Sequence, residues 1–232
     1  MGSIERRERE RGDKRRQILD AARELFVEEG YDAVTMRKVA DKVEYTPTAI
    51  YLHFKDKEEL VREVVSQDFL SLAKHFASIV EIDDPIEALR AMGKGYLDFA
   101  LKNPNHYRLM FMTKLPRTSE QLPEHHGNPS LDAYAMLCLL VHKAIERGLL
   151  RPDLTDAELV AQVVWAGVHG VAALRISCPE ADAWIQLRPV PVLGAEMIDD
   201  LMAGLLRNPP KRLPSKASKS AAQRPKRRRM SS

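Results

Sequence analysis

The sequence of 232 residues predicts an all-α protein, in which an N-terminal three-helix helix-turn-helix head sits on a larger helical-bundle body. Apolar residues recur at helical spacing along most of the chain, and Thr, Asp or Pro residues mark helix starts while glycines mark ends. The chain is longer than one typical domain of about 150 residues. We therefore expect the head at residues 13–60 and the body at residues 61–207.

Basic residues concentrate at both ends of the chain. Residues 1–16 carry a net charge of +3 and residues 208–232 carry +9, whereas the whole chain carries +3, so the residues between them sum to −9. Residues 1–12 are expected to form a charged, solvated arm rather than an arm that reads a minor groove. Residues 208–232 are expected to form a disordered basic tail, which either adds phosphate attraction or only improves solubility.

Cysteine usage and hydropathy exclude several protein classes. Cys138 and Cys178 lie far apart without a CxxC motif, which indicates neither a disulfide framework nor a zinc ribbon and suits the cytoplasm. No run of eighteen or more apolar residues exists, so no membrane partner is expected. Cys138 and His142 are four residues apart, but no further ligand completes a metal site. We expect no metal and no cofactor.

The first helix is expected at residues 13–29, where one stripe of apolar residues faces inward before Gly30 ends the helix. Thr35 then caps a helix of two turns through its hydroxyl. Apolar residues of this second helix recur at i, i+3, i+4 and i+7: Met36, Val39, Ala40 and Val43. Glu44 and Tyr45 interrupt it.

A third short helix begins after Thr46, which serves as its cap, with Pro47 at a first-turn position. Ile50 and Phe54 are expected to face inward, whereas Pro47, Thr48, Tyr51 and Leu52 point outward. Two short helices with a small, polar outer face fit the major groove of DNA.

The remaining helices follow the same start and stop signals. The Asp84-Pro85 pair marks a start and the Asn103-Pro104 pair a break. Gly148 ends another helix. The expected segments are residues 57–79, 85–102, 104–113, 129–147, 155–177 and 192–206.

From about residue 16 to residue 60, including the stretches AIYLHF and DKEEL, the chain resembles the DNA-binding domain of TetR-type (TetR/AcrR) transcriptional regulators. One departure is that most members have Gly in the turn where this chain has Glu44. The turn must then form without a residue that favours positive φ, and a carboxylate lies close to the DNA-facing surface. Further along, WAGVHG resembles the WHG-type C-terminal domain of one subgroup of the same regulators.

The resemblance implies a division of labour within the head. Residues matching Thr35, Tyr51 and Lys57 hold phosphates, while those matching Arg37, Pro47 and Thr48 lie nearest the bases. Only Arg37 can make a bidentate contact to guanine. His53 either reaches a phosphate or packs. The expected DNA-binding set is Thr35, Arg37, Thr46, Pro47, Thr48, Tyr51, His53 and Lys57.

A ligand pocket is expected in the body, where methionines and aromatic residues are frequent. Trp165 and His169 are four apart and share one helix face. A satisfied core histidine beside a packed tryptophan is the alternative, and core filling explains each of the other residues alone. The expected pocket residues are Tyr96, Phe99, Met110, Phe111, Met136, Trp165 and His169.

The sequence therefore predicts a cytoplasmic, ligand-responsive repressor. The resemblance implies a homodimer joined by the last two long helices, which would bind a near-palindromic operator in double-stranded DNA. A small, apolar effector would release it. The chain lacks a Walker loop, GxSxG, HExxH and a dinucleotide fingerprint, so no enzyme is expected. The alternatives are a ligand-binding or enzymatic protein whose head has lost sequence-specific recognition, and a nonspecific DNA-coating protein.

Overall fold

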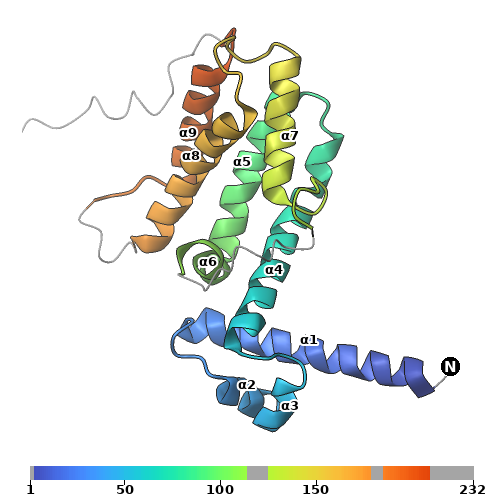
Figure 1. The fold of residues 1–232 in the computed structure, drawn as a ribbon. Coiled ribbons are helices and arrows are strands. Elements are labelled where there is room, and N and C mark those ends of the chain that lie inside the picture. The colour runs from blue at the N-terminus through green and yellow to red at the C-terminus, as the bar shows by residue number, and fades with distance from the viewer. Residues whose placement is uncertain (1–2, 114–124, 179–184, 210–232) are drawn as a thin grey trace, which may run out of the picture.

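The computed structural model describes residues 3–113, 125–178 and 185–209, which are helical apart from short connections. The head consists of α1 (Ser3–Glu29), α2 (Met36–Lys42), α3 (Pro47–Tyr51) and the start of α4 (Lys57–His75). Figure 1 shows this head below a bundle of longer helices. The bundle contains a 3-10 turn (Ala77–Glu81), α5 (Pro85–Lys102), α6 (Pro104–Tyr107), a π-helical turn (Arg108–Met112), α7 (Ala133–Glu146), α8 (Ala157–Ser177) and α9 (Val190–Leu205). The predicted all-α head-and-body architecture is confirmed.

The core of the head lies between α1, α2 and α4. Ile18 and Phe26 of α1 are buried against Val39 of α2, and Ile50 and Phe54 close the core from the third helix and the residues after it. These five side chains lose almost all contact with water, and each contributes about 1.5 to 3 kcal/mol to folding. The predicted inward faces of all three helices are therefore confirmed.

The arm expected at residues 1–12 is solvated as predicted where the structure describes it, but residues 3–12 are part of α1, which is helical from Ser3, and not a separate arm. The correction has a local reason, because charged residues of opposite sign alternate along these turns. Arg6 Nε lies 3.5 Å from Glu10 Oε1, four residues on, and Arg16 lies 3.9 Å from Asp13. Arg and Glu also favour helices, and pairs at this spacing add about 0.2 to 0.5 kcal/mol each.

The turn between α2 and α3 is built around Glu44, which has φ 58°. Among the described residues, every other residue with positive φ is a glycine, including the helix stops Gly30 and Gly148. The Tyr45 N–H donates to the Ala40 carbonyl at 2.9 Å, and the Tyr45 hydroxyl donates to Gln17 at 2.9 Å. The turn thus has the left-handed geometry for which glycine is better suited, and glutamate bears the steric cost.

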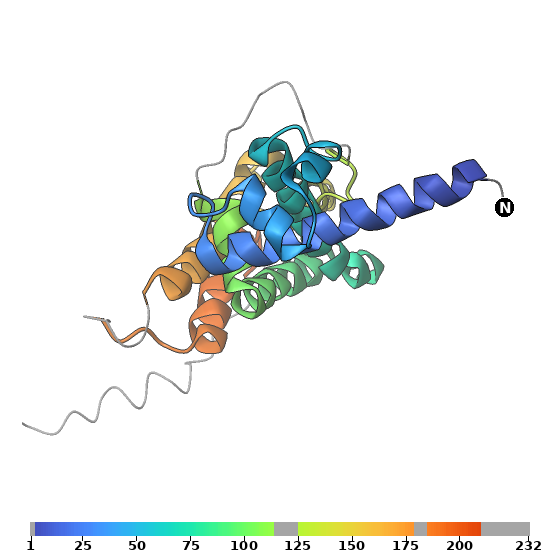
Figure 2. The ribbon, with the colours of Figure 1, turned by 90° about the horizontal axis from the view of Figure 1, so that it is seen from below.

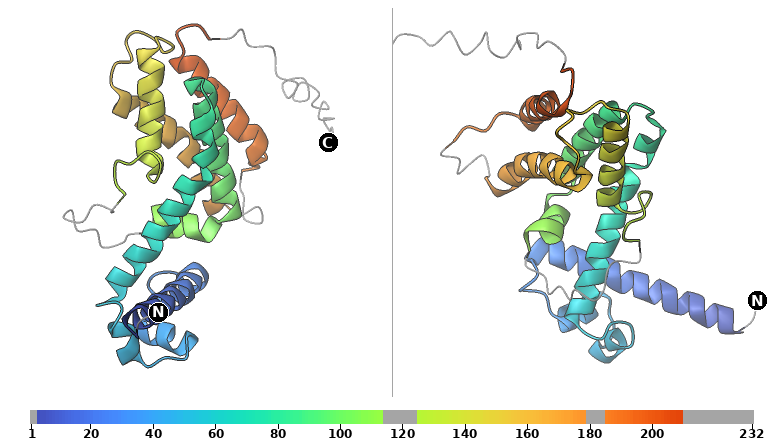
Figure 3. Two further views of the ribbon diagram at one scale, coloured as in Figure 1. Left: turned by 90° about the vertical axis from the view of Figure 1, so that its right-hand side faces the viewer. Right: turned by 45° about the horizontal axis from the view of Figure 1, so that its top comes forward.

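Helix α5 lies at the centre of the body. It packs against α8 and α9 on one side and against α7 and α4 on the other, as the two views of Figure 3 and Figure 1 agree. α8 is apolar and long enough to cross a membrane, but α5, α7 and α9 cover one side of it. Helix α4 belongs to both parts, since it starts in the head and ends in the bundle.

Several helix boundaries differ from those expected. The helix expected from residue 129 begins at Ala133, because Asp132 Oδ1 accepts hydrogen bonds from the N–H groups of Tyr134 and Ala135 at 2.9 and 3.2 Å. The segment expected as one helix at residues 104–113 is the short α6 followed by the π-helical turn. The helix expected at residues 57–79 ends at His75 and continues as the 3-10 turn. Most of the expected basic tail, residues 210–232, lies outside the described residues.

Replacing Glu44 by glycine should stabilise the head. The left-handed conformation costs a non-glycine residue about 1 to 2 kcal/mol, and part of this gain is offset by the flexibility of glycine in the unfolded chain. We expect Glu44→Gly to raise the free energy of unfolding in urea by about 1 kcal/mol. Glu44→Ala, which also removes the charge but keeps a Cβ, is the control and should bring no such gain. Equal stabilisation by both variants would show that the charge, not the backbone, is responsible.

Candidate functional site

Both threonines predicted to cap the helix-turn-helix do so. Thr35 Oγ1 accepts a hydrogen bond from the Lys38 N–H at 3.2 Å, and Thr46 Oγ1 accepts one from the Ala49 N–H at 3.3 Å. Each cap satisfies one of the N–H groups that a helix start leaves unpaired. A capping hydroxyl still has its own proton to donate, so both threonines can cap a helix and also contact a phosphate.

The outer face of α3 is polar and open to solvent. Pro47 and Thr48 are exposed, and Tyr51 is 53% exposed although it follows the fully buried Ile50. Arg37 is exposed on α2. In the view of the head from below in Figure 2, α2 and α3 lie in front of the body. The residues that the sequence assigned to base contacts are therefore exposed, on the two helices that lie in front of the body in this view.

Lys57 and His53 have different surroundings at the edge of this face. The Lys57 ammonium lies 4.1 Å from the centre of the Tyr31 ring, a cation–π contact that holds it at the start of α4. His53 is half-buried, and its Nδ1 has no hydrogen-bond partner among the described residues. Burial, followed by Arg11, Arg15 and Lys14, lowers the pKa of His53. Of the two roles left open for His53, the neutral, partly buried ring favours packing.

A buried carboxylate joins the head to the body. Asp68 of α4 is 5% exposed, and it is the only charged side chain buried to this degree in the described chain. Arg23 Nε of α1 donates to its Oδ1 at 3.1 Å, and His106 Nδ1 of α6 lies 3.2 Å from its Oδ2. The sequence analysis missed this group. Its signal is an acid at an apolar position of α4, midway between Val64 and Leu72.

The body contains a cavity of about 680 Å³, partly open to solvent, between α4, α5, α7, α8 and the segment that precedes α7. Its wall is mainly aromatic and aliphatic, which suits an apolar molecule of drug size. Polar groups gather on the part formed by the start of α7, where Gln162 Nε2 of α8 donates to the Tyr134 hydroxyl at 3.3 Å. The lining residues include Phe69, Leu72, Phe76, Met92, Tyr96, Phe111, Tyr134, Leu137, Gln162, Trp165 and Val168.

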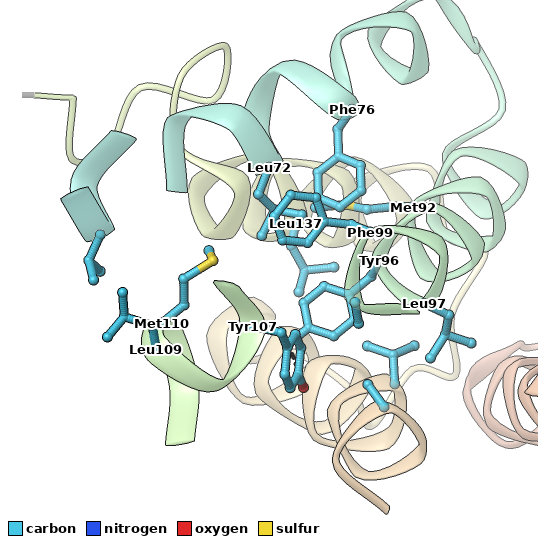
Figure 4. Packing of buried hydrophobic residues seen from close by; sticks show 14 of the residues in the cluster. Leu72, Phe76, Met92, Tyr96, Leu97, Phe99, Tyr107, Leu109, Met110 and Leu137 are labelled. Atoms are coloured by element: carbon cyan, nitrogen blue, oxygen red, sulfur yellow. Dashed lines mark hydrogen bonds between the residues drawn. The ribbon is translucent and has the colours of Figure 1, made fainter. Parts of the chain in front are cut away.

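Three of the seven predicted pocket residues, Tyr96, Phe111 and Trp165, lie on this wall. The other four do not. Phe99 packs beside His75, and Met110 is fully buried in the core, where Figure 4 shows it beside Leu109. Met136 borders a separate small cavity of about 150 Å³. Helical spacing predicts which residues are buried, but whether a neighbouring helix fills the space beside them depends on the packing of the bundle.

His169, the fourth of these, lies one layer behind the wall. The Trp165 Nε1–H donates to the Tyr96 hydroxyl at 3.2 Å, and Tyr96 donates to the Tyr107 hydroxyl at 3.2 Å. His169 Nδ1 lies 2.6 Å from the Tyr107 hydroxyl and 3.1 Å from the Tyr96 hydroxyl. Figure 4 shows the two tyrosines beside each other. The predicted alternative, a satisfied core histidine, is therefore the arrangement in the structure, although Trp165 does line the cavity.

Burial determines the protonation of this network. Burial lowers the pKa of His169, and burial followed by the Tyr96 hydroxyl raises the pKa of Tyr107. The ring is therefore neutral at pH 7, with one nitrogen protonated and the other able to accept a hydrogen bond. All four side chains are thereby oriented by one continuous set of hydrogen bonds.

Comparison with known proteins gives matches over both parts of the chain. The family profile described as bacterial regulatory proteins, tetR family, matches residues 18–64, and the tetracyclin repressor-like C-terminal domain matches residues 89–181. The WHG resemblance of the body stays a prediction.

Individual relatives match to different extents. TetC of transposon Tn10 from Escherichia coli is 30% identical over 37% of this chain, which spans 44% of that protein. The HTH-type transcriptional regulator TtgR of Pseudomonas putida is 26% identical over 77% of this chain and 87% of its own length. The solved SmeT–triclosan complex has a TM-score of 0.61 at 23% identity, over 87% of this chain and 99% of that chain, and shows the same fold.

Acidification should destabilise the fold through His169. Its pKa in the folded protein lies below the ordinary value of 6.5, so the unfolded chain takes up a proton first and stability falls as pH drops below 6.5. Each pKa unit of this difference corresponds to about 1.4 kcal/mol. We expect His169→Asn, which keeps an acceptor for Tyr107, to lose less stability than the unchanged protein between pH 7.5 and 5. Urea unfolding at several pH values measures this, and equal losses would exclude His169 as the cause.

Proposed function

Because this chain belongs to the TetR family of bacterial DNA-binding transcriptional regulators, we propose that it is a cytoplasmic repressor, which binds a near-palindromic operator as a homodimer and is released by a small apolar molecule. The observation that carries this proposal is the network around Asp68, which connects the helix beside the cavity to the first helix of the head. Through this connection a change of shape in the body can alter the position of the head.

In the proposed complex, α3 enters the major groove and its exposed face reads the bases. Arg37 is the side chain with the donor geometry to bind guanine O6 and N7, while Pro47 and Thr48 offer contact with thymine methyl groups. Thr35, Thr46, Tyr51 and Lys57 hold phosphates around this site. Exposure of all of these residues except the half-buried Lys57 supports the assignment.

The proposed dimer uses the outer faces of α8 and α9. Leu159, Val163 and Leu174 are 58%, 47% and 51% exposed and lie on one side of α8, opposite its buried residues. Val192 of α9 is exposed as well. Apolar side chains at this spacing form a seam that a second copy can bury, and a two-fold axis then presents two α3 helices to half-sites about 34 to 36 Å apart.

The proposed effector occupies the cavity of the body. The wall of aromatic and aliphatic side chains favours a ring-containing, uncharged molecule, and the hydroxyl of Tyr96 offers it a hydrogen bond. SmeT, which shares the fold, was solved with triclosan, a molecule of this chemical class. Triclosan is therefore a reasonable first probe.

Release requires that the ligand changes the position of the head. Tyr107 and His106 are neighbours on α6, and their side chains contact two different groups of residues. Tyr107 bonds to Tyr96 and His169 beside the cavity, whereas His106 meets Asp68, which holds Arg23 of α1. A ligand that displaces Tyr96 would thus shift α6 and disturb the contact that positions α1 and α4. The effect on DNA cannot exceed the difference in ligand affinity between the two shapes.

Selection of bound sequences from random duplex DNA at near-physiological salt tests the DNA-binding part. We expect enrichment of a near-palindrome with half-sites one DNA turn apart, both with the full chain and without residues 208–232. Arg37→Ala should weaken binding to the selected operator by about 1 to 3 kcal/mol, because it removes a bidentate base contact. It should weaken binding to random duplex DNA less.

Lys38→Ala is the matched control, since the Lys38 ammonium on the same helix is paired with Glu29. It should affect both duplexes little. Binding without any sequence preference, or binding lost with the tail, would instead support a nonspecific DNA-coating protein. Equal loss on both duplexes for Arg37→Ala would contradict its assignment to a base.

Fluorescence of Trp165 tests the ligand. In a Trp184→Phe variant, Trp165 is the only tryptophan left of the two in the sequence. We expect triclosan to quench its emission and, over the same concentration range, to release the operator in a gel-shift assay. Tyr96→Phe, which keeps the ring but loses the hydroxyl, should bind the probe more weakly by about 0.5 to 1.5 kcal/mol.

A His106→Gln variant separates binding from coupling. Its Trp165 fluorescence should be quenched at the same triclosan concentration as in the parent protein. Release of the operator should need a higher triclosan concentration. If triclosan quenches the fluorescence of the parent protein but does not release the operator, the protein binds the ligand without a response in the head. No quenching by triclosan or by other apolar ring compounds would contradict the proposed pocket.

A further inference from the structure

Helix α1 extends well beyond the part that packs into the core of the head. It has 27 residues, and its first residue that is buried in the core is Ile18. Residues 5–14 are exposed without exception. Figures 1, 2 and 3 agree that this N-terminal half projects beyond the rest of the molecule. At about 1.5 Å per residue, the exposed part extends roughly 20 Å from the first core contact.

The basic residues of this projecting helix fall into two groups. Arg6 is paired with Glu10, Arg15 with Glu63 and Arg16 with Asp13. Arg7, Arg11 and Lys14 have no carboxylate within salt-bridge distance among the described residues. Their spacing of four and three places them on one face of the helix. Glu10 lies beside this face, three residues from Arg7 and four from Lys14, but its carboxylate is paired with Arg6. We name these three residues the basic stripe.

The basic stripe lies on the side of α1 that meets the end of α3. Arg11 and Lys14 are close enough to His53, two residues beyond α3, to lower its pKa together with Arg15. The Arg15 guanidinium lies 4.3 Å above the Phe54 ring, which places the same side of α1 against this segment. Arg7 continues the line outward by one turn. The stripe therefore begins beside the residues that follow the groove-reading helix and runs away from the head.

We propose that the basic stripe binds DNA phosphates outside the base pairs read by α3, and so lengthens the contact of each head with the duplex. The inference rests on the proposed function for the position of α3 in the groove. Arg7 and Lys14 are about 10 Å apart along the helix, and one DNA strand carries a phosphate every 3.4 Å along the helix axis. Three unpaired cations on a straight helix thus match a short run of phosphates, and these contacts carry no sequence information.

The experiment compares two triple variants with the same loss of charge. The stripe variant carries Arg7→Gln, Arg11→Gln and Lys14→Gln, and the matched control carries Arg6→Gln, Arg9→Gln and Arg16→Gln on the other faces of the same helix. Glutamine is nearly as good a helix former as arginine and lysine, so α1 should persist, and circular dichroism checks this. Each protein is measured on the selected operator and on random duplex DNA of equal length.

We expect the unchanged protein to protect the sugar–phosphate backbone that flanks each half-site from cleavage at its sugars in a hydroxyl-radical footprint. The stripe variant should lose this flanking protection and keep the rest. The slope of log affinity against log salt should fall by about 0.9 for each phosphate contact removed, on both duplexes. The control should keep the footprint and most of the slope.

Equal effects of the two variants would overturn the inference, since net charge rather than the position of the stripe would then matter. A flanking footprint that survives in the stripe variant would overturn it too. Phosphate contacts also form on random duplex DNA. The salt dependence of the stripe and control variants on that DNA therefore tests the inference even if no operator is enriched. Absence of sequence preference would count against the proposed function alone.

Discussion

The arrangement of head and body depends on one buried ion pair, in which Arg23 of α1 meets Asp68 of α4. A carboxylate at this depth is tolerated because both of its oxygens have partners, Arg23 on one side and His106 on the other. Removing one member of such a pair leaves the other buried and unpaired, which costs about 3 to 5 kcal/mol. The pair therefore specifies how α1, α4 and α6 meet, and any force that moves α6 acts on the head.

The cavity and the head are connected through consecutive residues of α6. Tyr107 belongs to the hydrogen-bonded set behind the cavity wall, and His106 belongs to the set around Asp68. A short helix that presents neighbouring side chains to two different networks can transmit a small displacement without a long chain of contacts. Figure 4 shows Tyr96, which lines the cavity, beside Tyr107, which does not.

The head shows where local sequence rules succeed and where they fail. The two threonine caps, the inward positions of Ile50 and Phe54 and the start of α5 after Asp84 were predictable, because each depends on residues within one or two turns. The left-handed turn at Glu44 and the helical start of α1 run against the simplest expectation. In the first case the packing of α2 against α3 imposes the backbone, and in the second alternating charges stabilise an exposed helix.

The sequence by itself determined the all-α class, most helix boundaries and the residues that face out of α3, since periodicity and capping are local properties. The tertiary structure decided which apolar residues border empty space. Tyr96, Phe111 and Trp165 line the cavity, whereas Phe99 and Met110 have the same hydropathic pattern but are buried away from it. It also brought Arg23, Asp68 and His106 together from three separate helices, because contacts between distant residues depend on how helices cross, and spacing along the chain carries no information about that.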